Sequence, residues 1–353
     1  MNKRILLILL ALLSTSLVII GCPGPKEEVS TTPSASEVTE LRFSSFMPPF
    51  APQMNVYKEW AKKIEDATNG SIKITFYAAG TLIPPQDVIS GVQSGLADIA
   101  DATLSDQADI FPLTPTIQLP FMPLGDAESG YDIWMKLIDK FPEMNSEYKD
   151  FKILFRTTTG SYALHTSKGP VRVPEDLKGV KIYATGGLAD VMGKIGAAPM
   201  SMTAQDWVMS LERGLLEGMW MNFQGVYEMK CHEFLPYHTI FPSGVSLGMA
   251  LVIMNLDSWN KLPPDVQKVF DDLSLWATER VRQVAEMEAY ESAITAMEKA
   301  GQTIVRLTPE EEKLWRDVAM PVIEEYLAKV EKRGLPARAV YEEALRLAEE
   351  YVQ

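Results

Sequence analysis

The sequence predicts an α/β protein built as two lobes, and three observations support this. Strand-like and helix-like segments alternate over residues 41–101 and again over 151–213, which implies parallel strands joined by helices. About 310 residues follow the N-terminal region, enough for two lobes with separate cores. An amphipathic stretch from Pro264 toward Ala300 would form a helix roughly 50 Å long. Because this exceeds one small lobe, we expect the helix to brace both.

The first alternating region predicts three strands and two helices. Residues 41–46 alternate in polarity and predict a strand. Residues 52–67 carry an apolar stripe that predicts a helix, ending at Thr68-Asn69-Gly70. Strands are predicted over 71–77 and from residue 97 to 101, with a short helix over 85–95 between them.

The second region repeats this pattern and then becomes helical. Strands are predicted over 152–156, 162–166, 180–184 and 248–254, with short helices over 188–195 and 204–213. After the long helix, Thr308-Pro309-Glu310-Glu311 forms a capping box that predicts the start of a final helix.

The N-terminus predicts export and lipid anchoring. Lys3 and Arg4 precede an apolar run that ends at Ile20, too short and too terminal for a typical membrane span. Gly21-Cys22 then resembles a bacterial lipobox, so we expect residues 1–21 to be a signal peptide and Cys22 to carry lipid. The alternatives are an ordinary signal peptide or an uncleaved anchor helix. Residues 22–40 are rich in Pro, Ser, Thr and Glu and predict a disordered tether. Together, the signal peptide, the lipidated cysteine and the tether predict a protein outside the cytoplasm, in the periplasm or at the cell surface.

Composition and charge exclude several classes of function. Without residues 1–21, the chain holds 31 basic against 47 acidic residues, a net charge of −16, which argues against nucleic-acid binding. Cys231 is the only other cysteine, so no disulfide is expected within the chain, and the three histidines lack metal-site spacing. No nucleotide loop or catalytic constellation stands in its required context. We therefore expect no metal, no cofactor and no enzymatic activity.

The order of several motifs resembles the solute-binding proteins of tripartite ATP-independent periplasmic (TRAP) transporters, the DctP-like family. The resemblance covers nearly the whole folded body, from Leu41 to about Arg333, and no single motif is specific without the others. The segments that carry it include Ile72-Lys73-Ile74-Thr75-Phe76-Tyr77, Val92-Gln93-Ser94-Gly95-Leu96-Ala97-Asp98-Ile99, Val173-Pro174-Glu175-Asp176-Leu177-Lys178-Gly179 and Leu211-Glu212-Arg213-Gly214-Leu215-Leu216-Glu217-Gly218.

This resemblance implies a periplasmic-binding-protein-like α/β fold, with two lobes, hinge strands, a long lobe-spanning helix and a cleft that closes on a small-molecule solute. Lobe I would comprise residues 41–159 and 248–287, and lobe II residues 160–247 and 288–353. It also implies a monomer that delivers its solute to the permease subunits in the membrane.

At the solute site, this chain departs from the family. Most members have an arginine where Tyr183 stands, and part of the family has a second one at the position of Tyr162. That arginine usually pairs with the solute carboxylate. Three readings stay open: Arg156 substitutes; tyrosine hydroxyls and the backbone amides around Gly186 hold the carboxylate; or the solute is not an anion and Tyr183 stacks on it. The alternatives without a binding role are that Arg156 forms an ordinary ion pair and that Gly186 lies in a simple turn.

Further candidates come from strand ends, where ligands bind in α/β proteins. Ser45 and Phe46 follow the first strand, and Thr103 follows the third. After the motif ending at Gly218, Asn222 and Gln224 are candidate amides. Trp220 is a candidate pocket wall, with a core residue as the alternative. The expected ligand is a small organic acid, a monocarboxylate with an aromatic or branched body. The alternative is a receptor for a neutral or aromatic solute that serves a sensor or another transporter.

Overall fold

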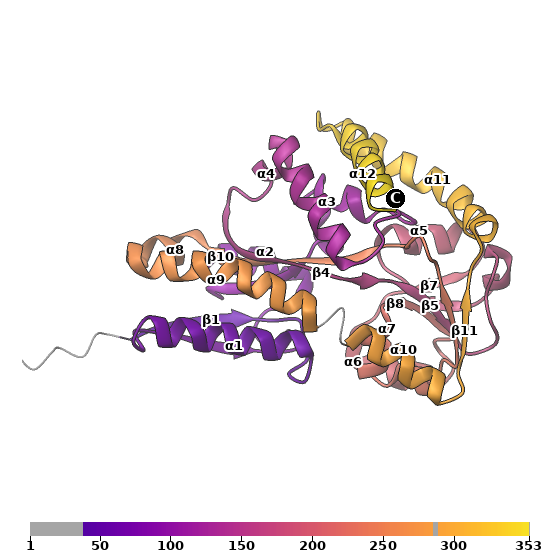
Figure 1. Ribbon diagram of the computed structural model, residues 1–353, viewed down its shortest axis with the longest axis horizontal. Coiled ribbons are helices and arrows are strands. Elements are labelled where there is room, and N and C mark those ends of the chain that lie inside the picture. The colour runs from indigo at the N-terminus through magenta and orange to yellow at the C-terminus, as the bar shows by residue number, and fades with distance from the viewer. Residues whose placement is uncertain (1–37, 285–288, 353) are drawn as a thin grey trace, which may run out of the picture. The chain divides into compact units, whose positions relative to one another are not determined.

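The computed structural model describes residues 38–284 and 289–352 (Figure 1). The predicted signal peptide, Cys22 and most of the predicted tether lie outside these residues. Strand β1 begins at Thr39, so the folded body starts two residues before the predicted Leu41. The described chain is built on two β-sheets.

The first sheet has five strands in the order β2-β1-β3-β10-β4. β1 pairs in parallel with β2 and β3, whereas β10 runs antiparallel to both β3 and β4. A late strand therefore lies between two early ones, so the chain returns to this sheet after building the second. Each strand predicted for lobe I is present; the bounds are β1 (Thr39–Ser44), β2 (Ile72–Tyr77), β3 (Ile99–Thr103), β4 (Phe151–Ser161) and β10 (Leu247–Asn255).

Helices α1 (Pro52–Ala67) and α9 (Pro264–Arg282) pack together on one face of the first sheet. The indole of Trp60 on α1 lies edge-on to Phe155 of β4 and to Phe270 of α9, with ring centroids 5.2 and 5.6 Å apart. Trp60 is completely buried, and burial of a side chain this large is a major source of stability for the layer. The other face packs against α2 (Val88–Gln93) and α3 (Ala127–Lys140).

The second sheet has six strands in the order β11-β9-β5-β8-β6-β7. β6 pairs in parallel with β7 and β8, while β5 runs antiparallel to β8 and β9. The bounds are β5 (Ala163–Thr166), β6 (Lys181–Tyr183), β7 (Ala198–Met200), β8 (Gly218–Met221), β9 (Tyr237–Ile240) and β11 (Thr303–Arg306).

Two groups of helices flank the second sheet. The apolar residues of α5 (Gly186–Lys194) and α11 (Pro309–Glu331) share one core cluster. Those of α6 (Ala204–Glu212), α7 (Phe223–Glu228) and α10 (Ala289–Lys299) share another. The remaining short elements are η1 (Pro85–Asp87), η2 (Ser105–Gln107), η3 (Thr114–Gln118), α4 (Pro142–Ser146), η4 (Pro174–Leu177), η5 (Cys231–Glu233) and α8 (Leu256–Lys261).

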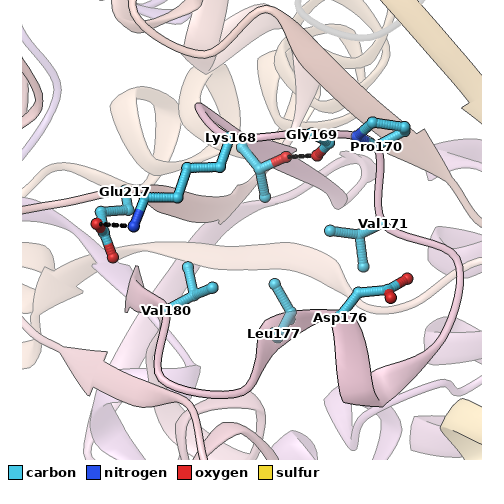
Figure 2. A pocket seen from close by; sticks show the side chains of 9 residues that line it. Lys168, Gly169, Pro170, Val171, Asp176, Leu177, Val180 and Glu217 are labelled. Carbon is cyan, nitrogen blue, oxygen red and sulfur yellow. Dashed lines mark hydrogen bonds and ion pairs between the residues drawn. The ribbon is translucent and has the colours of Figure 1, made fainter.

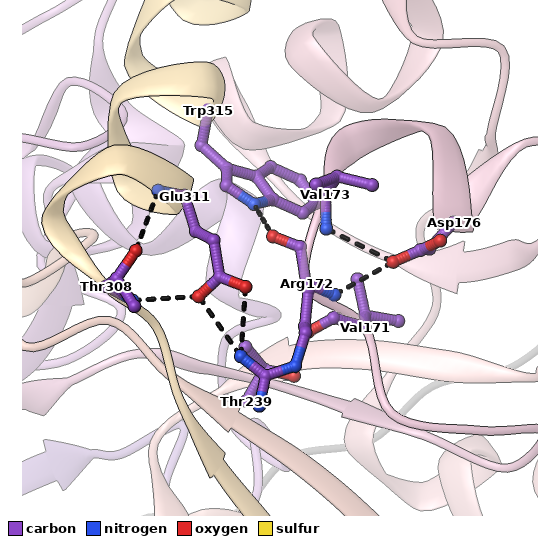
Figure 3. Close-up of polar contacts among 8 residues, drawn as sticks. All are labelled: Val171, Arg172, Val173, Asp176, Thr239, Thr308, Glu311 and Trp315. Carbon is purple, nitrogen blue, oxygen red and sulfur yellow. Dashed lines mark hydrogen bonds and ion pairs between the residues drawn. The ribbon is translucent and has the colours of Figure 1, made fainter.

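The start of α11 is fixed by the predicted capping box (Figure 3). The Thr308 hydroxyl accepts from the Glu311 backbone N–H at 3.3 Å, and the Glu311 carboxylate accepts from the Thr308 N–H at 2.8 Å. The same carboxylate pairs with Arg172 at 2.9 Å, and the indole N–H of Trp315 donates to the Arg172 carbonyl. These contacts anchor α11 to the segment between β5 and β6.

The chain passes from the first sheet to the second through a single residue. β4 ends at Ser161 and β5 begins at Ala163, so Tyr162 lies between them. Its backbone N–H donates to the carbonyl of Ser246 at 3.0 Å, just before β10 begins at Leu247. The two sheet-to-sheet connections near Tyr162 and Ser246 thus lie side by side, where the resemblance implied hinge strands.

The C-terminal third differs from the prediction. The long helix is described as two helices, α9 and α10, and residues 285–288 between them lie outside the described residues. The predicted final helix is also two, because α11 is followed by Gly334, at a φ of 78°, and Pro336 before α12 (Ala337–Val352) begins. α12 packs against α3 and against α11 (Figure 1). Among the described residues, no helix is long and apolar enough to span a membrane.

Candidate functional site

The strand ends of the first sheet hold a buried carboxylate. Asp101 on β3 is 1% exposed and accepts from the Ser45 hydroxyl at 2.6 Å and from the Phe46 backbone N–H at 2.9 Å. Burial raises the pKa of Asp101 to about 7, although these hydrogen bonds act in the opposite direction. The Ser45 hydroxyl therefore serves the fold: its proton goes to Asp101 and its oxygen accepts from the Met47 N–H.

Tyr183 ends β6 at the corresponding edge of the second sheet. Its ring lies edge-on to the indole of Trp207 on α6, with centroids 5.0 Å apart and an interplanar angle of 61°. Burial raises the pKa of Tyr183, and Tyr162 and Asp106 raise it further. The phenol thus stays protonated at any physiological pH and acts as a neutral hydrogen-bond donor.

The charge of Asp106 raises the pKa of Tyr183, which indicates that a turn after the first sheet faces the end of β6 in the second sheet. Asp106 lies in η2, directly after β3, and its carboxylate accepts from the Thr103 hydroxyl at 3.0 Å. Thr103, Asp106, Tyr162 and Tyr183 therefore belong to one polar neighbourhood. In it the fixed charge on these side chains is negative, because phenols stand where the family's arginines are expected.

The turn from β8 into α7 carries two buried amides. Asn222 caps α7, its side-chain oxygen accepting from the Gly225 N–H at 2.7 Å. The side-chain N–H groups of Gln224 donate to Gln53 of α1 at 3.3 Å and to Glu228 at 3.1 Å. Gln53 and Gln224 are only 6% and 4% exposed, so this amide pair is a buried polar link between the helix layers of the two sheets.

Two concavities lie elsewhere. One of about 210 Å³ is lined by residues around the β5–β6 connection, where Lys168 pairs with Glu217 at 2.5 Å (Figure 2). It includes Val180, before β6 begins, whereas Tyr183 ends that strand. The other, of about 300 Å³, lies between α3 and α12 and includes Asp126 and Tyr351. None of the predicted site residues lines either of them.

Comparison with known proteins identifies the architecture. The model of the family named bacterial extracellular solute-binding protein, family 7, DctP, matches residues 43–329. The chain belongs to this family. Its members are solute-binding proteins of transporters, which confirms both the TRAP resemblance and the prediction that the chain is not an enzyme.

Individual relatives agree with this assignment. The C4-dicarboxylate-binding periplasmic protein DctP of Rhodobacter capsulatus is 25% identical over 307 residues, covering 85% of this chain and 90% of that protein. A TRAP periplasmic solute-binding protein from Desulfovibrio salexigens superposes with a TM-score of 0.76 at 25% identity, covering 90% and 97%. One from Rhodoferax ferrireducens, crystallised with co-purified benzoate, gives 0.80 at 24% identity, covering 89% and 99%. The predicted two-lobed periplasmic-binding-protein-like fold is confirmed.

Two predicted site residues of this TRAP receptor lie in packed surroundings. Trp220 is 1% exposed, its indole N–H points to the sulfur of Met192, and its ring packs on those of Phe121, Phe241 and Trp315. This is the core alternative considered for Trp220.

Arg156 lies on β4 opposite Leu251, and its guanidinium is over the rings of Trp134 and Tyr148, at 5.7 and 5.5 Å. Burial lowers the pKa of Arg156. No contact among the described residues links Arg156 to Tyr183. The described contacts also include no ion pair of Arg156, which was the alternative to a solute-binding role.

Gly186 stands at the first position of α5, with a φ of 53°. This left-handed backbone favours glycine, and a Cβ here would meet no atom within 4 Å. Gly187 is different, because a Cβ on it would approach Pro120 to 2.9 Å. The pair of glycines therefore combines a turn with a close contact, and a role for its backbone amides in binding stays a prediction.

Sequence reasoning missed three residues of this neighbourhood. Trp207 is not among the predicted site residues, yet it is the ring against Tyr183, and its indole N–H is buried without a partner among the described residues. Gln53 and Asp106 were not selected, because their positions depend on which helices and turns meet in three dimensions. The only available signal was that Asp106 comes three residues after the candidate Thr103. Within the described residues, no cluster of three or more metal-ligating side chains was found.

Proposed function

We propose that this receptor binds a small monocarboxylate with an aromatic or branched body between the strand ends of its two sheets. The observation that carries the proposal is the Tyr183–Trp207 ring pair at the position where most of the family has an arginine. Aromatic side chains in such geometry favour contact with an aromatic or branched group. The protonated Tyr183 hydroxyl supplies one neutral donor for a carboxylate oxygen.

The charge of the neighbourhood argues against a dicarboxylate. Asp106 contributes negative charge near Tyr183, and Arg156 lies over Trp134 and Tyr148. A second carboxylate on the solute would be repelled with little cationic compensation. The benzoate found with the Rhodoferax ferrireducens relative supports an aromatic monocarboxylate as the first compound to test.

A thermal-shift series tests this function, combined with denaturing mass spectrometry of solute retained through purification. A ligand that binds only the folded protein adds about 2.7 kcal/mol at a hundredfold excess over its Kd. We expect benzoate and branched monocarboxylates to raise Tm, and succinate and malate to leave it unchanged. Tight succinate binding that survives Tyr183→Ala would refute the proposed site.

The second candidate is a receptor for a neutral solute, serving a sensor or another transporter. The negative charge contributed by Asp106 favours it, because a hydroxyl or amide of a neutral solute can donate to that carboxylate. Benzamide, which replaces the carboxylate of benzoate with an amide, separates the candidates. Stabilisation by benzamide and not by benzoate would select the neutral solute.

We further propose that the receptor acts as a monomer tethered outside the cytoplasm through lipidated Cys22 and delivers its solute to membrane permease subunits. The lipobox-like Ile19-Ile20-Gly21-Cys22 supports this. Cys22→Ser should move the protein from the membrane fraction to the soluble fraction. Unchanged membrane association of this variant would contradict lipid anchoring.

A further inference from the structure

Two histidines form a buried chain of hydrogen bonds across the second sheet. Nδ1 of His165 on β5 lies 2.7 Å from Nδ1 of His238 on β9, and both side chains are 0% exposed. At one end of the chain, Nε2 of His165 lies 3.0 Å from the Met221 carbonyl oxygen. At the other end, Nε2 of His238 lies 2.9 Å from Oε1 of Gln302, whose Nε2 donates to the His232 carbonyl at 2.8 Å.

Counting protons along this chain gives a definite result. Carbonyl oxygens only accept, so the Met221 contact needs a proton on His165 Nε2, and the His232 contact fixes the orientation of the Gln302 amide. Oε1 of Gln302 then needs a proton on His238 Nε2. The contact between the two Nδ1 atoms needs one more. Three protons on two imidazoles are one more than a neutral pair holds.

We propose that His165 and His238 together form a site for one shared proton, which, when bound, fixes the Met221 carbonyl and the turn that follows it. Without this proton, one of the hydrogen bonds must open, because two acceptors would face each other. A second extra proton is excluded, since it would place two cations in contact across 2.7 Å.

The surroundings set the pH at which the proton binds. Burial lowers the pKa of both histidines, that of His238 to about 4, against an ordinary value of about 6.5. The pair titrates as a unit, so we expect its first proton between these limits. The titratable groups on the packed elements include His232, which lowers the pKa of His238, Tyr290 against Phe223, and Glu228, which accepts from Gln224. They also include Tyr237 of β9, Tyr227 of α7, Glu291, Glu298 and Lys299 of α10, and the exposed Glu233 and Arg306.

The proton site adjoins the candidate solute site through the backbone. Met221 ends β8, and Asn222 and Gln224 follow it directly. The Phe223 ring lies against both imidazoles, with centroid distances of 5.0 Å to His165 and 5.5 Å to His238. His165 and His238 are therefore positioning residues for the β8–α7 turn. This link to solute binding rests on the proposed function, whereas the proton count does not.

The count can be measured directly, because the whole chain has only three histidines. Untagged protein with ¹⁵N-labelled imidazoles, carrying His232→Asn, leaves only the pair visible by NMR. As the pH falls from 8 through the midpoint, we expect the two rings to gain one proton in total, and Nε2 of His165 to be protonated only when this proton is bound. Uptake of no proton, or of two with independent midpoints, would overturn the proposal.

A second variant separates a proton site from a merely structural contact. Gln302→Glu places a carboxylate beside His238 Nε2 and should raise the midpoint by about one to two pH units. A midpoint that stays where it is in wild type would overturn the proposal, and this holds even if direct substitution of either histidine prevents folding.

Solute affinity supplies the functional readout, with benzoate as the probe. One recovered hydrogen bond predicts affinity about fivefold higher below the midpoint measured by NMR than at pH 7.5, after allowance for protonation of the carboxyl of the probe. In Gln302→Glu the rise should come at higher pH. If NMR confirms uptake of one proton but benzoate affinity does not change with pH, the coupling between the histidine pair and solute binding is refuted. Absence of benzoate binding at every pH would count against the proposed function, and the proton count would still be decided by NMR.

Discussion

The ring of Tyr183 lies edge-on against the indole of Trp207, with their centroids 5.0 Å apart. The pair joins the end of β6 to α6, so in the proposed site it would form an aromatic wall beside the Tyr183 hydroxyl. An arginine at this position would supply two charged donors, whereas the phenol supplies one neutral donor. With tyrosine in place of arginine, the solute would lose electrostatic attraction and gain apolar contact with the ring. The first prediction follows from this difference.

Tyr183→Phe should weaken binding of an aromatic monocarboxylate by about fivefold, because one hydrogen bond is lost while the ring is kept. Tyr183→Ala should weaken it by more than tenfold, since the wall beside Trp207 is lost as well. Isothermal titration calorimetry measures both. Tyr131→Phe on α3 is the matched control and should leave affinity unchanged. Equal affinities for all three variants would show that the solute binds elsewhere.

Arg156→Lys should leave solute affinity within twofold of wild type. The guanidinium lies over Trp134 and Tyr148, and a lysine keeps the charge but lacks the planar group that contacts both rings. The cost should appear as about 1 kcal/mol in the free energy of unfolding, measured by urea denaturation. A tenfold loss of affinity for carboxylates, with stability unchanged, would restore Arg156 as the solute's cationic partner.

Features that depend on neighbouring residues in the sequence could be predicted, whereas contacts between residues far apart in the chain could not. The strands ending near Ser45, Thr103 and Tyr183 were predicted because alternation and turn residues are local signals. The helix α3 was missed, although its Asp126–Ser129 capping box fixes the start of an amphipathic helix. The contacts of Gln224 with Gln53 and of Trp220 with Trp315 were beyond reach, because each joins residues about a hundred or more positions apart.

Asp101 should make the protein less stable as pH rises from 4 to 8. Its pKa of about 7 in the folded state exceeds the roughly 3.9 of an unfolded chain, so the folded state holds the proton more tightly. The stability gained from this proton is fully present below pH 3.9 and is lost as pH rises through 7. Asp101→Asn cannot ionise, so its stability relative to wild type should improve by roughly 2 to 4 kcal/mol over this range.

Urea denaturation at several pH values measures this difference, and the shared titration of Glu228 cancels between the two proteins. Asp109→Asn is the control, because that side chain is 92% exposed and should give a small, nearly constant difference. A difference between Asp101→Asn and wild type that does not change with pH would mean that Asp101 titrates normally in the folded protein.

Gln53 and Gln224 should act as a coupled pair, because their amides meet at 3.3 Å while both are buried. Gln53→Ala leaves one donor of Gln224 unpaired, whereas Gln224→Ala also removes the contact with Glu228. Once either is gone, removal of the other costs less, so the double variant should lose less stability than the two single variants combined. We expect a coupling of about 0.5 to 1.5 kcal/mol in the free energy of unfolding.

The same cycle measured on solute affinity distinguishes two roles for this link between the helix layers of the two sheets. If the pair only holds the helices together, the coupling appears in stability and not in benzoate affinity. If the contact forms as the solute is enclosed, the coupling appears in affinity as well. Solute binding then gains this hydrogen bond in the wild type, and each variant lacks it. Gln267→Ala, which removes an amide contact to the Trp259 carbonyl within the first sheet's helix layer, is the control and should couple to neither residue. Additive effects of Gln53→Ala and Gln224→Ala in both measurements would contradict the link itself.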